Sequence, residues 1–315
     1  MRRASDPLQL TGTVDVQQLE LPEHVAAPLD ARLELAGTVG TVTSPLVVWR
    51  GWTLRDVNAR IAWDAAGFRL DPAQAQLAGG VLTGAVTWAR SAAGRMHPEG
   101  WVKLRGADVN ELSATRLPEG RVTGVVEAEG SFDGAAGLSA INADLDLAVV
   151  EGAFVALPVA ALAAESLGLP PALWERWPFR NLAGHVKVRA GRLQVDSLRI
   201  EQEGILWRAA GSIGPGGDLD LAGSLIADPT RIRLPAAIEV LARTVADDGG
   251  RIPVDFALDG PATSARLRFD WDEFSRRVAE RARDRQGERL EQILEDTVKD
   301  PEVLQRLRDV LKKKP

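Results

Sequence analysis

Two pairs of carboxylates come closest to a catalytic or metal-binding pattern in this 315-residue sequence. Asp144 and Asp146 stand two residues apart, a spacing that places both side chains on one face of a β-strand. Asp218 and Asp220 repeat that spacing. Such a pair can bind calcium or act as general acid and base. The alternating residues are apolar and point to the other face: Leu145, Leu147, Leu219 and Leu221. We therefore interpret both pairs as parts of a solvated polar face.

The other residues with catalytic potential lack the neighbours that a site requires. The histidines are His24, His97 and His185, and their spacing matches no metal-binding motif. The glycine-rich segment 214–217 has no following Lys-Ser or Lys-Thr, so it reads as a turn and not as a phosphate-binding loop. Ser131 and Ser212 follow glycines without forming a nucleophile elbow, and the chain has no cysteine. The sequence thus predicts no catalytic residue, no metal and no cofactor.

Composition and charge indicate a folded protein that does not bind nucleic acid. Hydrophobic residues make up 45% and charged residues 26%, which is ordinary for a globular chain. A net charge of -6 with a pI near 5.3 argues against a nucleic-acid partner. No apolar run reaches the roughly 18 residues that a membrane helix needs. Because a strand pattern begins almost at Met1, we expect a piece of a longer exported chain; the alternative is a cytosolic protein.

Apolar residues at every second position predict β-strands along most of the chain. The pattern is clearest in 181–227, where short alternating stretches are separated by Ala190-Gly191, Glu203-Gly204 and Pro215-Gly216-Gly217. Similar stretches occupy the first 119 residues. Short strands joined by glycine-centred turns predict an antiparallel meander, about seven residues to a strand, with one apolar and one charged face.

Three segments interrupt the alternation with helical spacing. Residues 157–177 predict two short helices, because Gly168-Leu169-Pro170-Pro171 must break the first. Residues 235–246 predict another short helix, and 271–315 predict a charged amphipathic tail divided at Asp300-Pro301. The tail is either a solvated helix pair or a docking surface for a protein or an anionic membrane. The candidate contact residues of the tail are Leu304, Leu307, Leu311, Lys312, Lys313 and Lys314.

The order of motifs between Gly120 and Trp271 resembles the C-terminal region of the AsmA-like family of bacterial envelope proteins. The likeness rests on Val150-Glu151-Gly152-Ala153-Phe154, read as a small turn, Leu157-Pro158, Asn181-Leu182-Ala183-Gly184, Ile252-Pro253-Val254 and Leu258-Asp259-Gly260-Pro261. The resemblance implies an elongated, twisted β-sheet curled into an open apolar groove. It also implies a periplasmic protein anchored in the inner membrane, with a role in phospholipid transport or outer-membrane biogenesis.

We therefore divide the chain into three parts. Residues 1–119 form the β-rich first part of the groove, and 120–270 form the AsmA-like β domain with the helical insert at 157–177. Residues 271–315 form the tail. Strands of about seven residues would be roughly 23 Å long, comparable to an acyl chain. Alternation alone favours a filled β-sandwich, in which the same apolar residues are plain core; the resemblance favours the groove.

The favoured function is non-enzymatic lipid binding or conduction. Its candidate groove-lining residues are Val122, Val126, Leu145, Leu147, Val149, Val186, Val188, Leu193, Ile205, Trp207, Leu219, Leu221 and Leu225. Tryptophans that suit the groove or its rim are Trp49, Trp52, Trp63, Trp88, Trp101 and Trp207, while Trp174, Trp177 and Phe179 are expected to fix the helical insert on the sheet. The alternatives are an assembly factor with a closed sandwich core and the tail as its binding surface, and an enzyme if a pocket gathers several carboxylates.

Overall fold

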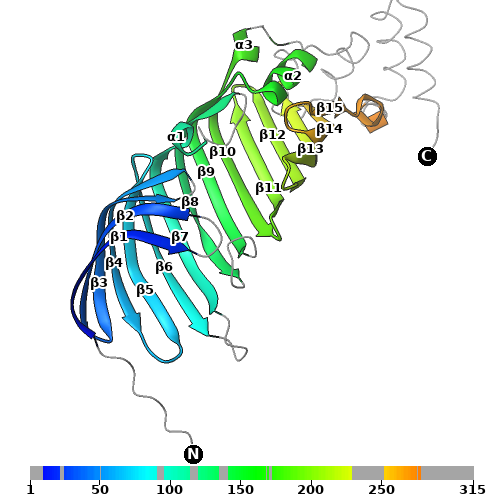
Figure 1. Cartoon of the computed structure of the whole chain (residues 1–315). Helices are drawn as coiled ribbons and strands as arrows, with labels where there is room; N and C mark the ends of the chain where they lie inside the picture. The colour runs from blue at the N-terminus through cyan, green and yellow to red at the C-terminus, as the bar shows by residue number, and fades with distance from the viewer. Residues whose placement is uncertain are drawn as a thin grey trace, which may run out of the picture.

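One antiparallel sheet contains every strand of the protein that the structure describes. The computed structural model describes residues 10–21, 25–49, 51–90, 96–113, 120–134, 141–167, 169, 172–228, 252–274 and 276–277. Its fifteen strands are hydrogen-bonded in chain order, so each strand pairs with the strands before and after it in the sequence (Figure 1). The strands are β1 (Leu10–Leu21), β2 (Val25–Gly37), β3 (Val39–Trp49), β4 (Trp52–Trp63), β5 (Gly67–Leu77), β6 (Gly80–Arg90), β7 (Met96–Asp108), β8 (Arg121–Gly134), β9 (Ile141–Val155), β10 (Arg176–Arg189), β11 (Arg192–Gln202), β12 (Ile205–Ile213), β13 (Asp218–Ala227), β14 (Ile252–Pro261) and β15 (Arg266–Phe269).

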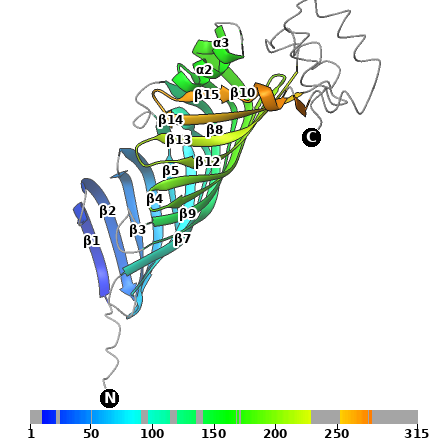
Figure 2. The same cartoon turned by 90° about the vertical axis from the view of Figure 1, so that its right-hand side faces the viewer.

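This architecture confirms the predicted fold class. The sheet is elongated, twisted and open, with β1 and β15 at its two ends (Figure 2). A two-sheet sandwich is not formed, since the strands within the described ranges all belong to one sheet. The sheet also continues across the predicted boundary at residue 119, because β7 pairs with β8 from Glu99–Asp133 to Asp108–Val125.

The helices are short and lie in the connections at one end of the strands. They are α1 (Val109–Ser113), α2 (Pro158–Ser166) and α3 (Ala172–Glu175). The predicted pair of helices in 157–177 is confirmed, and α2 begins with proline in its first turn, where a missing amide hydrogen removes no helical hydrogen bond. Residues 271–274 and 276–277 are also helical. The predicted helix at 235–246 and the rest of the tail lie outside the described residues.

The strands are longer than the sequence pattern predicts, because bulges carry them through apparent turns. β9 has 15 residues, about 50 Å at roughly 3.3 Å per residue. The predicted turn at 150–154 is wrong: it lies inside β9, where Glu151 has a φ of 52° and the register with β8 shifts. A bulge adds a residue to one strand and bends it without ending the pairing.

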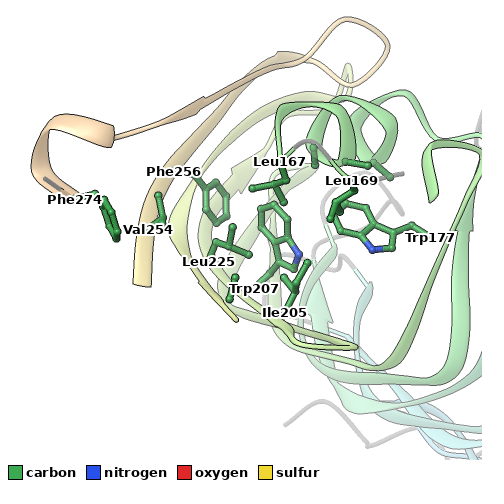
Figure 3. Packing of buried hydrophobic residues seen from close by; sticks show 13 residues of the cluster. Leu167, Leu169, Trp177, Ile205, Trp207, Leu225, Val254, Phe256 and Phe274 are labelled. Carbon is green, nitrogen blue, oxygen red and sulfur yellow. The ribbon is translucent and has the colours of Figure 1, made fainter. Parts of the chain in front are cut away.

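The buried core lies near the helices, at the same end of the strands. One cluster joins α2, through Ala164 among others, to the sheet. Its residues Leu167, Trp207, Leu225 and Val254 lie on one side of the strands (Figure 3). A second cluster, which includes Leu77, Leu104, Ala107, Val126, Val149 and Phe179, packs against Val109 and Leu112 of α1. The helices thus cover part of one sheet face.

Candidate functional site

The register places all of the predicted groove-lining residues on one face of the sheet. Val126 is opposite Val149, Leu145 is opposite Val186, and Val188 is opposite Leu193. The remaining pairs continue this face through β12 and β13, where Trp207 is opposite Leu225 and Ile213 is opposite Leu219. Cross-strand partners share a face, so the pairing establishes a common apolar surface for residues chosen from the sequence. We call it the apolar face.

The apolar face is continuous from the first strand to the last. A transverse row of paired residues, one from each strand, contains no polar side chain: Val14, Leu33, Val42, Ala59, Ala73, Gly84, Val102, Gly130, Leu145, Val186, Val195, Gly211, Leu221, Leu258 and Leu267. A second row, from Gly12 and Leu35 to Leu219 and Gly260, is also built of apolar residues and glycines. The apolar surface therefore spans the length of the sheet.

Burial divides the candidate residues into two groups. Close to α2, Ile205 and Leu225 are core residues, at 5% and 0% exposure, so their predicted role as open groove lining is wrong. Val126 and Val149 are buried in the cluster beside α1. Val186 and Leu221 are also buried.

Farther from the helices the apolar face is partly open to solvent. There the side chains of Leu145, Leu147 and Val188 are half-buried. Val122 and Leu219 are half-buried as well, but Val122 packs beside α1 and Leu219 lies close to α2. Leu193 is 37% exposed. In the described part of the chain no second sheet covers these residues. This part of the face therefore presents accessible apolar surface of the kind that takes an apolar ligand or partner.

An apolar pocket lies between α2 and the sheet. Its volume is about 250 Å³, and its lining includes Ala160 and Ala163 of α2 together with Trp207, Leu221 and Phe256 of the strands. The buried polar groups there are bonded to each other, since Trp207 Nε1 donates to Gln202 Oε1 over 2.8 Å. Gln202 Nε2 donates in turn to the carbonyl of Pro178. The pocket is therefore lined by apolar side chains, and the buried polar groups beside them are already hydrogen-bonded.

The tryptophans take several positions that the sequence did not distinguish. Trp207 contacts Trp177 and Phe256 edge-on at ring distances of 5.9 and 5.2 Å. Trp177 also packs in the buried cluster that contains Ala160 and Ala163 of α2, so it joins the helical insert to the sheet as predicted. Trp88 stacks on Phe68 at 4.3 Å. The assignment of Trp101 to the groove or its rim is wrong: Trp101 is paired with Ser131 and lies near Lys103, on the face opposite the groove. Trp52 and Trp63 are half-buried, and the side chains of Trp49 and Trp174 lie outside the described set.

The opposite face is polar, as the carboxylate pairs predicted. Asp144 and Asp146 both contact His185, at 3.0 Å to Nε2 and 2.8 Å to Nδ1. Beside them a hydrogen bond between Lys187 and Asp196 raises the pKa of the lysine and lowers the pKa of the aspartate. Sequence reasoning missed this cluster, because a bulge in the β10–β11 pairing brings Asp196 to the histidine.

A broad hollow of about 1230 Å³ crosses the middle of this polar face and gathers carboxylates. Most of them face a cation: Glu129 pairs with Lys103, Asp196 with Lys187, and Asp255 with Arg277. Within the residues that the structure covers, no three His, Asp or Glu side chains are arranged to hold a metal ion. The hollow is thus a largely charge-paired surface, with His185 between carboxylates near its centre.

Comparisons with known proteins add no further assignment. No protein-family model, no curated protein and no solved structure matches this chain. A helix long and apolar enough to cross a membrane does not occur among the described residues. The predicted contact residues of the tail, from Leu304 to Lys314, lie outside that set.

Proposed function

We propose that this chain is a non-enzymatic lipid-binding protein whose apolar face shelters acyl chains while the head groups stay in water. One observation carries the proposal: paired apolar residues and glycines cross all fifteen strands without a polar interruption, and much of that surface is half-exposed. A sheet of this size normally hides such a face beneath a second layer. Acyl chains supply that layer without needing any hydrogen-bonding partner.

The wider role that fits this face is lipid conduction within the bacterial envelope, in support of phospholipid transport or outer-membrane assembly. An uninterrupted row lets an acyl chain move from strand to strand while it stays in contact with hydrocarbon. A charged or polar side chain in the row would add a desolvation barrier at that strand. The motif order that resembles the AsmA-like family supports the same role, with the protein in the periplasm and anchored to the inner membrane.

The test is lipid capture by protein produced with an envelope-targeting leader. Native mass spectrometry and extraction should show copurifying phospholipid, and a photo-crosslinkable phospholipid should label the chain. We choose Leu145→Asp with Leu147→Asp as the disrupting variant, because both positions are on the apolar face and half-buried. Ile205 and Leu221 are unsuitable, since they are buried and a charge there would unfold the protein.

Val150→Asp is the matched control, because Val150 is in the same strand, is 45% exposed and points to the opposite face. We expect the double variant to lose lipid while retaining the circular dichroism of a β-protein, and the control to keep its lipid. A folded, lipid-free wild-type protein that also resists the crosslinkable lipid would exclude the proposed function.

A further inference from the structure

The pocket under α2 exists because the helix faces the sheet with small side chains. Its buried residues are Ala160, Ala163 and Ala164, whose methyl side chains extend little toward the strands, and Ala160 and Ala163 line the pocket. On the sheet side the pocket is bounded by large side chains, among them Trp207 and Phe256 (Figure 3). A helix with leucine at these positions would close the gap. The alanines therefore hold open a space that ordinary core packing would fill.

The chemistry of the lining restricts what can occupy this space. The polar atoms of Trp207 and Gln202 are bonded to each other, so neither is offered to a ligand. A head group, an ion or ordered water would have no partner in the pocket, and apolar cavities of this type stay dry and take apolar guests. The occupant must therefore be hydrocarbon.

The size of the pocket restricts the occupant further. At about 250 Å³ it is smaller than the roughly 300–1,000 Å³ of pockets that enclose a whole small ligand. It is also too small for a partner helix, whose diameter is about 10 Å. Leu219, Leu221 and Leu258 line the pocket and also belong to the transverse apolar rows, so the space opens onto the apolar face. A flexible chain that lies on those rows can end inside it.

We propose that the pocket under α2 receives the methyl end of one acyl chain of a bound phospholipid. This inference rests on the proposed function and adds to it: the α2 edge of the apolar face is a terminus for lipid tails, held by Ala160 and Ala163 above and Trp207 and Phe256 below. The head group lies away from α2, on the open part of the face.

Two photoreactive phospholipids test the inference on the full chain. One carries a diazirine at the methyl end of an acyl chain, and the other carries it next to the head group. We expect the methyl-end probe to label α2, Trp207 and Phe256, and the head-proximal probe to label the open part of the apolar face. Peptide mapping of the labelled wild-type protein identifies the labelled positions, so this measurement needs no variant.

Filling the pocket provides the second measurement. Ala163→Leu should reduce methyl-end labelling of the pocket on the order of tenfold, the factor expected when about two methylenes lose their burial. Ala161→Leu is the control, because Ala161 is on the same helix but is half-buried and outside the pocket lining. It should label like the wild type.

The outcomes separate the two proposals. If lipid labels the apolar face but the methyl-end probe never labels the pocket, the terminus is wrong and the lipid-binding function stands. Equal pocket labelling of wild type and Ala163→Leu would also overturn the terminus. If neither probe labels the chain anywhere, both proposals fail. Methyl-end labelling of α2, Trp207 and Phe256 that falls in Ala163→Leu, together with head-proximal labelling of the open part of the apolar face, supports both.

Discussion

At the scale of single residues, the apolar face tolerates a polar atom where that atom has a partner. Trp207 is 8% exposed and its indole nitrogen donates to Gln202. The same ring contacts Trp177 and Phe256, so one residue satisfies a buried glutamine and joins three strands. A buried polar group that loses its partner bears the full cost of desolvation. Trp207 is therefore the residue whose hydrogen bond and ring contacts can be tested separately.

Trp207→Phe should destabilise the protein by about 2 kcal/mol. The change leaves the Gln202 oxygen without its donor, and the smaller ring makes less contact with Trp177 and Phe256. Urea unfolding followed by circular dichroism measures the change. Adding Gln202→Leu to the variant should recover part of the loss, since both polar partners are then gone. Trp101→Phe is the control: Trp101 is 46% exposed on the opposite face, and its change should stay within about 0.5 kcal/mol. Equal losses at both tryptophans would contradict this view.

The sequence pattern predicted well which sheet face a residue occupies, and poorly which side chains it contacts. Alternation assigned Leu145, Val186 and Trp207 to one face because the period of a strand is fixed by the backbone. Residue type alone misplaced Trp101, because an aromatic residue suits either an apolar surface or its exposed boundary. The contacts of His185 depend on the register of β9, β10 and β11, which a bulge shifts and which no local pattern encodes.

At the scale of elements, glycines on the apolar face let neighbouring strands approach closely. A Cβ at Gly223 in β13 would lie 1.8 Å from the backbone oxygen of Arg208 in β12. One at Gly130 in β8 would lie 2.0 Å from the oxygen of Asp144 in β9. Real Cβ atoms do not come so near to a carbonyl oxygen, so these positions permit a local geometry that a side chain forbids.

Gly223→Ala should therefore cost about 1–3 kcal/mol, because the strands must separate to admit the methyl group. Gly214→Ala is the matched control in the adjacent turn, where the nearest atom would be 3.5 Å away, and it should be neutral or slightly stabilising. Thermal unfolding of the two variants distinguishes them. A Gly223→Ala protein as stable as the control would show that this approach is not needed.

The segment after β15 is fastened to β14 by charge. Arg277 pairs with Asp255 of β14 and, at 2.9 Å, with Glu273 of its own helical turn. Hydrogen bonds from Arg276 first, and from Arg277 second, hold the pKa of the Glu273 carboxyl below its ordinary value of 4.5. Because the folded pKa is the lower one, the stabilisation is complete above pH 4.5 and is lost as the pH falls through the folded pKa.

Glu273→Gln should accordingly lower the urea midpoint at pH 7 and have less effect as the pH drops below about 4, where the wild-type carboxyl becomes neutral. Measuring both proteins from neutral to acidic pH tests the sign. Asp272→Asn serves as the control, since Asp272 is exposed one residue away, and its effect should not follow this profile. A difference between Glu273→Gln and wild type that grows on acidification would contradict the assignment.

Element lengths show where sequence reasoning stops. The two helices of the insert were predictable because Gly168 to Pro171 cannot continue a helix. The strands were predicted too short, because a glycine beside a charged residue, as at Glu151-Gly152, serves a bulge as well as a turn. That distinction is made by the neighbouring strands, which hold the pairing on both sides of the bulge.

At the scale of the molecule, the sequence left open whether the apolar residues line a groove or fill a sandwich. Alternation is the same in both, because each strand needs one apolar face in either architecture. The difference lies in whether late strands fold back over early ones. Here each hairpin adds one strand to the edge of the previous one, so the face grows in length and is not covered by a second sheet within the described ranges.

This length leads to a prediction about the number of lipids that bind. Fifteen strands have fourteen spacings of about 4.8 Å, so the transverse row measures roughly 67 Å along the sheet. A bilayer core of about 30 Å holds two opposed tails, which makes one tail about 15 Å long. The row therefore exceeds a single tail about fourfold, and lipid-saturated protein should bind more than one phospholipid at once.

Native mass spectrometry should resolve a series of lipid-bound species. Val102→Asp should shorten that series, because Val102 is the β7 member of the row and its charge interrupts the apolar surface near the middle. Lys103→Asp changes the adjacent residue on the opposite face and should leave the series intact, although it removes the ion pair with Glu129. A single bound lipid at saturation, unchanged in Val102→Asp, would confine binding to one site and rule out conduction along the face. Loss of all lipid in Val102→Asp, with the fold retained, would instead mean that lipids bind as one continuous layer.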